Sequence, residues 1–142
     1  MQTQNPNFRR KVQEIFDRAA FIAEVGLKVS EIGAGWCETT LEIGPRHLQQ
    51  DDFVHAGVLA TMADHTAGGA AGSVVREDQV VLSVEFKINL LRPATGETLR
   101  CRAELLRAGR TLIVAEAEVF ARKSDQEKLV AKATVTLAVV NR

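Results

Sequence analysis

The sequence predicts an α+β fold in which an antiparallel β-sheet wraps around one long buried helix, and three observations support this. Residues 55–75 carry no Lys or Arg and a single carboxylate, Asp64, which is typical of a helix buried on all sides. Short alternating segments joined by turn residues flank this helix, two before it and four after it. The chain has 142 residues, 46% of them hydrophobic, which fits one domain with a sizeable core. We therefore expect a single domain over residues 1–142.

The first expected element is an amphipathic helix over residues 6–23, within an N-terminal segment (1–24) that packs on the rest of the domain. Asn5 and Pro6 form a helix-start pair, with Asn as the cap and Pro at the first helical position. The apolar side chains that follow fall on one helical face: Phe8, Val12, Ile15, Phe16, Ala19 and Ala20. Gly26 ends the segment.

Two strands and an irregular loop separate this helix from the central one. The strands are expected at 27–32 and 36–43, joined into a hairpin by the turn Gly33-Ala34-Gly35. Residues 46–54 are polar and irregular, so we expect a loop that leads into the helix at 55–75.

The central helix is long enough to span a membrane, but we reject that interpretation. Asp64, His65 and a cluster of glycines lower its apolarity, and basic residues are missing before it. Each of Gly68, Gly69 and Gly72 costs about 1 kcal/mol relative to Ala inside a helix. Such a cost is tolerated where another element approaches the backbone closely. We therefore expect a helix wrapped by protein and no membrane partner.

Four strands are expected after the central helix, at 80–90, 99–106, 111–122 and 129–139. The turns between them are short, so they should form an antiparallel meander. The first of the four alternates without a break, which places Leu82, Val84 and Phe86 on one face and Ser83 on the opposite, polar face. The outer face of the sheet and the glycine-bearing side of the helix would still need covering. A second subunit is the simplest cover.

Composition excludes several classes of function. The formal net charge is zero, from 18 basic and 18 acidic residues, so no nucleic-acid partner is expected. Cys37 and Cys101 lack metal-ligand spacing and read as free, buried thiols; we expect neither a metal site nor a cofactor. The N-terminus has no apolar signal segment, so we expect a cytoplasmic protein.

Asp64 needs a physical reason for its position. An unpaired carboxylate buried among apolar groups costs several kcal/mol or takes up a proton. The chain segments around it are similar to those of a known family: His55-Ala56-Gly57, then Asp64, then Val81–Phe86, Leu91–Ala94 and Ala108–Thr111. In this order and spacing, the sequence resembles the hotdog-fold acyl-CoA thioesterases of the phenylacetate-degradation (PaaI) type, over roughly residues 20 to 140.

The resemblance implies hydrolysis of acyl-CoA with Asp64 as general base or nucleophile. It implies that the backbone N–H of Ala56, at the start of the helix with Gly57, points at the thioester carbonyl, and that Ser83 helps position the water. The family's usual Asn is Gln49 here, and its usual first Gly is Ala56, which keeps an N–H for the oxyanion only if its φ is negative.

The chemistry fits the residues as well. The start of a buried helix offers unpaired N–H groups and partial positive charge to a developing oxyanion. Eight residues separate Ala56 from Asp64, which is about 12 Å along a helix, so one carbonyl cannot easily touch both. We therefore expect a site shared between subunits, in a homodimer that assembles further to a homotetramer. Candidate substrate-binding residues are His55, Arg92 and Arg110, the arginines through the phosphates of coenzyme A.

Other interpretations stay open. A hotdog protein that binds acyl thioesters without turnover is the main alternative, and a hotdog hydratase is less well supported. His55 can equally cap the helix or anchor its loop, and Ser83 can face solvent. We expect His65 to be a satisfied interior or interface residue. Nothing in the sequence specifies the acyl group.

Overall fold

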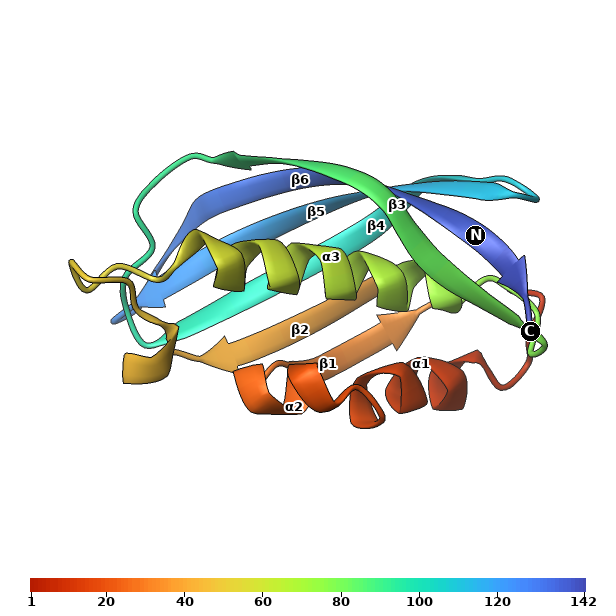
Figure 1. Cartoon of the computed structure of the whole chain (residues 1–142), viewed down its shortest axis with the longest axis horizontal. Coiled ribbons are helices and arrows are strands. Elements are labelled where there is room, and N and C mark those ends of the chain that lie inside the picture. Colours follow the sequence, from red (N-terminus) through yellow and green to blue (C-terminus); the bar gives the residue numbers. More distant parts are fainter.

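The computed structural model describes residues 1–142, and its centre is helix α3 (Ala56–Gly72) (Figure 1). A six-stranded antiparallel sheet curls around α3, which confirms the expected α+β hotdog architecture. The strands are β1 (Lys28–Gly33), β2 (Trp36–Glu42), β3 (Gln79–Leu90), β4 (Thr98–Ala108), β5 (Leu112–Lys123) and β6 (Gln126–Asn141). Their spatial order is β1-β2-β4-β5-β6-β3. A short 3₁₀ helix, η1 (Pro45–His47), precedes the loop that leads into α3.

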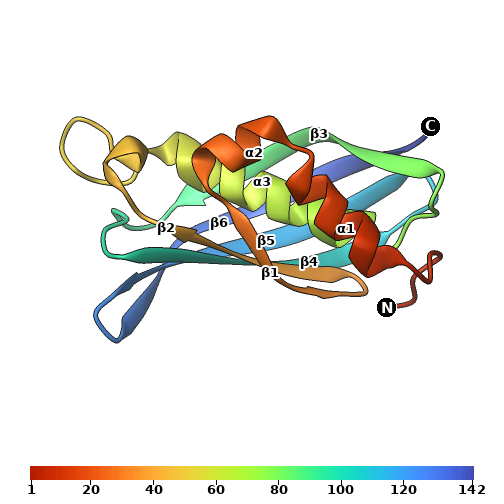
Figure 2. The same cartoon turned by 90° about the horizontal axis from the view of Figure 1, so that it is seen from below.

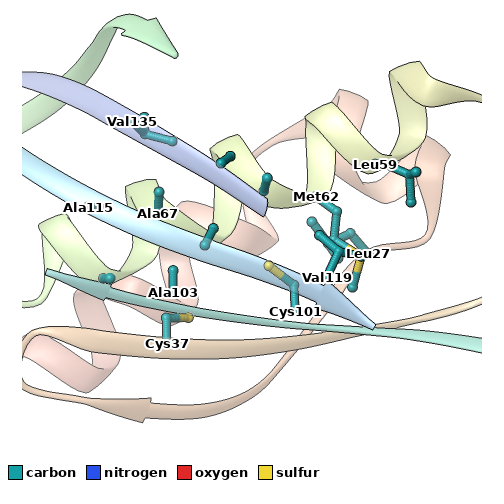
Figure 3. Packing of buried hydrophobic residues seen from close by; sticks show 14 of the residues in the cluster. Leu27, Cys37, Leu59, Met62, Ala67, Cys101, Ala103, Ala115, Val119 and Val135 are labelled. Atoms are coloured by element: carbon teal, nitrogen blue, oxygen red, sulfur yellow. The ribbon is translucent and has the colours of Figure 1, made fainter. Parts of the chain in front are cut away.

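Small side chains on the inner face of the sheet let α3 lie close to it. In Figure 3, Ala67 of α3 lies near Ala103 and Ala115 of the sheet, and Met62 lies near Cys101 and Val119. The two cysteines are free and buried in this core, as expected. Burial raises the pKa of both thiols to about 12, so they remain neutral packing groups at physiological pH.

The N-terminal segment forms two helices, and the expected single helix over 6–23 is wrong in this detail. Helix α1 (Phe8–Asp17) and helix α2 (Ala20–Val25) are separated because the backbone of Ala19 is extended, with φ −85° and ψ 97°. Asn5 does not cap α1; its side chain accepts a 2.8 Å hydrogen bond from the N–H of Asn7 in the turn before the helix. Helix α1 lies against α3 on the side that the sheet leaves uncovered, and α2 continues from α1 (Figure 2).

The expected four-strand meander is also only partly right. Strands β4, β5 and β6 follow one another in the sheet, but β3 pairs with β6 and leaves β4 to pair with β2. The reason is the connection between β3 and β4, residues 91–97, which contains Pro93 and a Gly96 with φ +130° and is too long for a hairpin turn. It crosses one end of the molecule, so β3 becomes an edge strand (Figure 1).

Two surfaces were expected to need a second subunit. The outer face of the sheet carries ion pairs, such as Arg100 between Glu38 (2.5 Å) and Glu127 (2.7 Å), so it is a charged surface. On the glycine-bearing side of α3, α1 contacts Gly69 and Gly72 and leaves Gly68 open. Exposed apolar side chains gather instead on the edge strand β3, where Leu82 and Val84 are 58% and 61% exposed. None of the helices combines the length and apolarity that a membrane span requires.

Candidate active site

Asp64 lies in the middle of α3, half-buried, with its carboxylate beside an open cleft. This Asp64 cleft has a volume of about 430 Å³ and lies between α1, α3 and β3. The hydroxyl of Ser83 donates a 2.6 Å hydrogen bond to Oδ1 of Asp64. No protein donor contacts Oδ2, so one oxygen of the carboxylate is free to accept a proton. The only carboxylate of the buried helix is therefore held in place and accessible.

A β-bulge aims Ser83 at α3, which the sequence pattern did not predict. Ser83 pairs with Leu137 of β6 and Glu85 with Thr136, so Val84 is an extra residue without an opposite partner. A bulge of this kind exchanges the two faces of a strand. Ser83 therefore shares the inner face with Phe86, and the expected unbroken alternation over 80–90 is wrong. Because of this one inserted residue, Ser83, which was expected on the polar face of the strand, points at Asp64.

The start of α3 offers one free amide. His55 caps the helix, and its Nδ1 accepts a 2.8 Å hydrogen bond from the N–H of Gly57. The N–H of Val58 bonds to the carbonyl of His55, which leaves the N–H of Ala56 without a partner in the chain. The φ of Ala56 is not positive, so alanine satisfies the backbone requirement set by its place in the family pattern. Gly57, in contrast, has its amide engaged by His55.

The side chain of Gln49 bonds within its own loop, residues 49–53. Its side-chain oxygen accepts hydrogen bonds from the N–H groups of Asp51 (2.5 Å) and Phe53 (3.2 Å). Its backbone N–H bonds to the carbonyl of Phe53, which closes the turn. The amide side chain therefore fixes the loop before α3, and it bonds to neither Ala56 nor Asp64.

The structure separates the two candidate arginines. Arg92 and Ala56 line one apolar cleft of about 300 Å³, the Ala56 cleft, together with Leu90 and Phe53. The guanidinium of Arg92 donates a 2.8 Å hydrogen bond to the carbonyl of Leu129. The turn that carries Arg110 lies at the opposite end of the molecule, beside the C-terminal end of α3 (Figure 1). Arg110 is thus far from the start of α3.

Arg92 also borders a larger groove that the sequence did not reveal. This Arg92 groove, of about 660 Å³, shares Phe53, Arg92 and Pro93 with the Ala56 cleft and adds Lys123 and Lys128 from the β5–β6 hairpin. The two lysines lie beside Arg92 and Pro93 because the 91–97 connection crosses the end of the molecule where the β5–β6 hairpin lies. No local pattern in the sequence signals this meeting.

His65 lies at the edge of the Asp64 cleft but belongs partly to the core. Its ring makes a T-shaped contact with Phe16 of α1, with centroids 4.6 Å apart. Its Nε2 is buried without a hydrogen-bond partner in the chain, so a fully satisfied interior histidine is not what the structure shows, and an interface histidine stays a prediction. Burial lowers the pKa of His65, and the neighbouring carboxylate of Asp64 opposes this shift.

The free amide and the carboxylate lie on one helix, about 12 Å apart along its axis. The Asp64 cleft and the Ala56 cleft have no lining residue in common. The chain thus carries a candidate base in one cleft and a candidate oxyanion donor in another.

Comparison with known protein families identifies the family of this chain. The family model described as the thioesterase superfamily matches residues 52–128, more than half of the chain. The chain belongs to the thioesterase superfamily. The predicted family and the predicted class of enzyme, a thioester hydrolase, are confirmed at this level. The matched residues include α3, β3 and the whole of the Ala56 cleft.

Solved structures and curated relatives agree. A thioesterase family protein from Silicibacter pomeroyi is 36% identical and superposes with a TM-score of 0.94, over 96% of this chain and 100% of its own. The PaaI protein of Escherichia coli, 19% identical, shares the fold with a TM-score of 0.85 over 94% of each chain. The 1,4-dihydroxy-2-naphthoyl-CoA hydrolase of Listeria monocytogenes is 24% identical over 81% of this chain and 91% of its own. The medium/long-chain acyl-CoA thioesterase YigI of E. coli is 27% identical over 61% and 63%.

Proposed function

We propose that this protein hydrolyses acyl-CoA thioesters to the free acid and coenzyme A. The observation that carries the proposal is the hydrogen bond from Ser83 to Asp64 at the mouth of an open cleft. A carboxylate on an otherwise apolar helix, fixed by one hydroxyl and accessible through its second oxygen, is arranged for proton transfer or attack. Two relatives whose names state that they hydrolyse CoA thioesters support the substrate class.

In the proposed reaction, Asp64 acts as general base or as nucleophile. As base, it takes a proton from water while the water oxygen attacks the thioester carbon. The N–H of Ala56 then donates to the resulting oxyanion, an interaction worth about 3 kcal/mol when it is aimed at developing charge. The C–S bond breaks, and the proton held by Asp64 passes to the sulfur of coenzyme A. Ser83 keeps the carboxylate oriented throughout.

We further propose that Ala56 and Asp64 of one site come from different subunits. The separation of about 12 Å along α3 prevents one carbonyl from meeting both groups of the same chain. A homodimer with antiparallel α3 helices pairs the two groups twice, once on each side of the twofold axis. The free edge of β3, with Leu82 and Val84 exposed, supports an interface there, because long apolar edge strands are normally covered.

The proposed biological unit is this homodimer, assembling to a homotetramer in the cytoplasm. Each subunit is the single domain over residues 1–142, with the segment 1–24 packed on it. Buried Val12 and Phe16 in the common core support the assignment of α1 to that domain.

We propose that the coenzyme A part of the bound substrate extends from the reaction centre past Arg92. The Ala56 cleft adjoins the Arg92 groove, because the two share lining residues. Three basic side chains, Arg92, Lys123 and Lys128, line the groove with one carboxylate, Asp125. Basic side chains of this kind suit the phosphates of coenzyme A. Arg110, at the far end of the molecule, has no part in this proposal.

Complementation between two inactive variants tests the shared site. Asp64→Ala removes the base, and Ala56→Pro removes the free N–H at a position where proline is tolerated in a helix. The backbone of His55, with φ −60° and ψ 138°, already has the extended form that precedes proline. Each variant alone should release thiol from acyl-CoA at least about 100-fold more slowly than the wild type.

Random exchange of subunits between the two variants should restore about a quarter of wild-type activity. Half of the dimers are then mixed, and each has one of its two sites intact. The control mixes each variant with itself under the same conditions. If proven mixed dimers release thiol no faster than the variants alone, the shared site is refuted. If wild-type protein binds acyl-CoA but never releases thiol, the protein is the non-catalytic binder of the alternative interpretation.

A further inference from the structure

The three glycines near the end of α3 have different surroundings. A Cβ on Gly72 would lie 2.7 Å from Cδ1 of Ile15, and a Cβ on Gly69 would lie 3.0 Å from both Sγ of Cys37 and the ring of Phe16. These two glycines let α1 and β2 approach the helix closely, as the sequence predicts. A Cβ on Gly68 would meet no atom within 4 Å. Close packing therefore explains two of the glycines and leaves Gly68 unexplained.

Gly68 faces the Asp64 cleft. It follows Asp64 by four residues, so it lies on the same face of α3, about 6 Å farther along the axis. Both residues line the cleft, whose walls there include the apolar side chains Ile15, Val81 and Leu137. The cleft of about 430 Å³ is within the size range of small-ligand sites, about 300–1,000 Å³. A side chain at position 68 would project into this space.

We propose that Gly68 determines which acyl groups the protein accepts, because the acyl part of the thioester lies in the Asp64 cleft and passes over Gly68. This inference rests on the proposed thioester hydrolysis at Asp64. The acyl group then runs from the carbonyl beside Asp64 across Gly68, between Ile15 of α1 and Val81 of β3. The coenzyme A part occupies the separate clefts at the start of the partner's α3.

The surroundings of the cleft set the kind of acyl group that fits. Its apolar wall continues from Gly68 to Val75 and Leu137, and charged side chains, including Lys11 and Glu77, also line it. An apolar acyl chain can cover the first part, but a longer chain must pass the charged groups. We expect good turnover of medium-length acyl groups that need the space above Gly68, and poor turnover of very long ones.

The energetic cost of Gly68 supports a role in ligand binding. Glycine in the middle of a helix is about 1 kcal/mol less favourable than alanine. Alanine would fit here without contact within the chain, so packing inside the subunit does not require the missing side chain. The property that glycine adds to the cleft is space.

The test compares acyl-chain preference in Gly68→Ala, Gly68→Val and wild-type protein. Thiol release is measured with acetyl-, butyryl-, octanoyl- and decanoyl-CoA. We expect Gly68→Val to lower kcat/KM for decanoyl-CoA about 10-fold to 100-fold relative to butyryl-CoA, since one or two methyl groups in an apolar pocket discriminate by that amount. Gly68→Ala should shift the same ratio in the same direction by less. The melting temperature of Gly68→Ala should not fall, which excludes misfolding as the cause.

Gly69→Ala is the matched control. It makes the same change one residue later, at a glycine that does not line the Asp64 cleft. Assayed well below its melting temperature, it should keep the wild-type ratio of decanoyl- to butyryl-CoA turnover. If Gly68→Val slows all four substrates equally, or changes none, Gly68 does not select the acyl group. Wild-type protein that releases thiol from no substrate would instead refute the proposed function itself.

Discussion

Helix α3 has a sealed face and an open face, and the two carry different kinds of residue. On the sealed face, Met62, Ala63 and Ala67 are fully buried against the sheet. On the open face, Asp64 and Gly68 are only half-buried and border a cleft. Small and apolar residues on the sealed face are explained by packing alone. On the open face, packing explains neither the carboxylate nor the missing side chain, so those residues indicate function.

Replacing one residue on each face should separate activity from stability, and this is the largest effect we expect. Asp64→Asn keeps the size of the side chain and an acceptor for Ser83 but cannot take up a proton, so kcat should fall about 10²-fold to 10⁴-fold, with little loss of stability. Thr66→Val removes the buried hydroxyl that lies 2.8 Å from Oγ1 of Thr39 and should lower the melting temperature. Its kcat per folded molecule should stay near that of the wild type. Thiol release and calorimetry are measured on both variants. A large loss of stability in Asp64→Asn, or a large loss of kcat in Thr66→Val, would contradict the distinction between the two faces.

A smaller effect is expected at Ser83 of β3, which donates the hydrogen bond to Asp64 on the open face. Its hydrogen bond to a charged acceptor is worth about 1.5–3 kcal/mol, so Ser83→Ala should lower kcat about 10-fold to 100-fold. Ser83→Thr, which keeps the hydroxyl, should recover part of the loss. Ser30→Ala, at an exposed serine of β1, is the control and should leave kcat unchanged. A Ser83→Ala protein with wild-type kcat would mean that the bond only docks β3 on α3.

The fold was predictable because its main signals are local. The largely apolar stretch at 55–75 and the alternating strands identified the wrapped helix, and the motif around His55 with Asp64 identified the family. The failures involve long-range relations. Nothing local distinguishes a bulge at Val84 from regular alternation, so the orientation of Ser83 could not be read. The crossing of residues 91–97 could not be read either, and with it the meeting of Arg92 with Lys123 and Lys128 was missed.

The site was predicted in the same uneven way. Asp64, Ala56 and Ser83 occupy positions that the proposed chemistry can use. Gln49 and Gly57 instead hold the loop and the helix cap, because the side chains of Gln49 and His55 take nearby backbone amides. Local hydrogen bonds of this kind depend on rotamers and loop geometry, which a motif does not specify.

Two glycines of one helix should respond differently to alanine. Gly72→Ala puts a methyl group 2.7 Å from the terminal Cδ1 of Ile15 in α1, so the Ile15 side chain must move and the substitution should stabilise the fold less than Gly68→Ala does. Gly68→Ala meets open space and should stabilise the helix by up to about 1 kcal/mol. Chemical denaturation of both variants measures the difference. Equal effects of the two substitutions would mean that the contact with Ile15 does not offset the gain in helix propensity at position 72.

The smallest effect is expected at His65, which lies on the boundary between the two faces. Burial lowers its pKa in the folded protein, so below the ordinary histidine value of about 6.5 the unfolded chain binds more protons than the folded one. The contribution of neutral His65 to stability is therefore complete above that pH and is lost as the pH falls toward the lowered pKa. The carboxylate of Asp64 opposes the shift and keeps this loss small.

His65→Phe keeps an aromatic ring against Phe16 and removes the titration. Melting temperatures of the variant and the wild type are compared from about pH 7.5 to about pH 5, across the ordinary range of histidine titration. The wild type should lose more stability over this interval than the variant does. If the melting temperatures of the two proteins fall equally with pH, the fold does not penalise protonation of His65, and its ring is open to water.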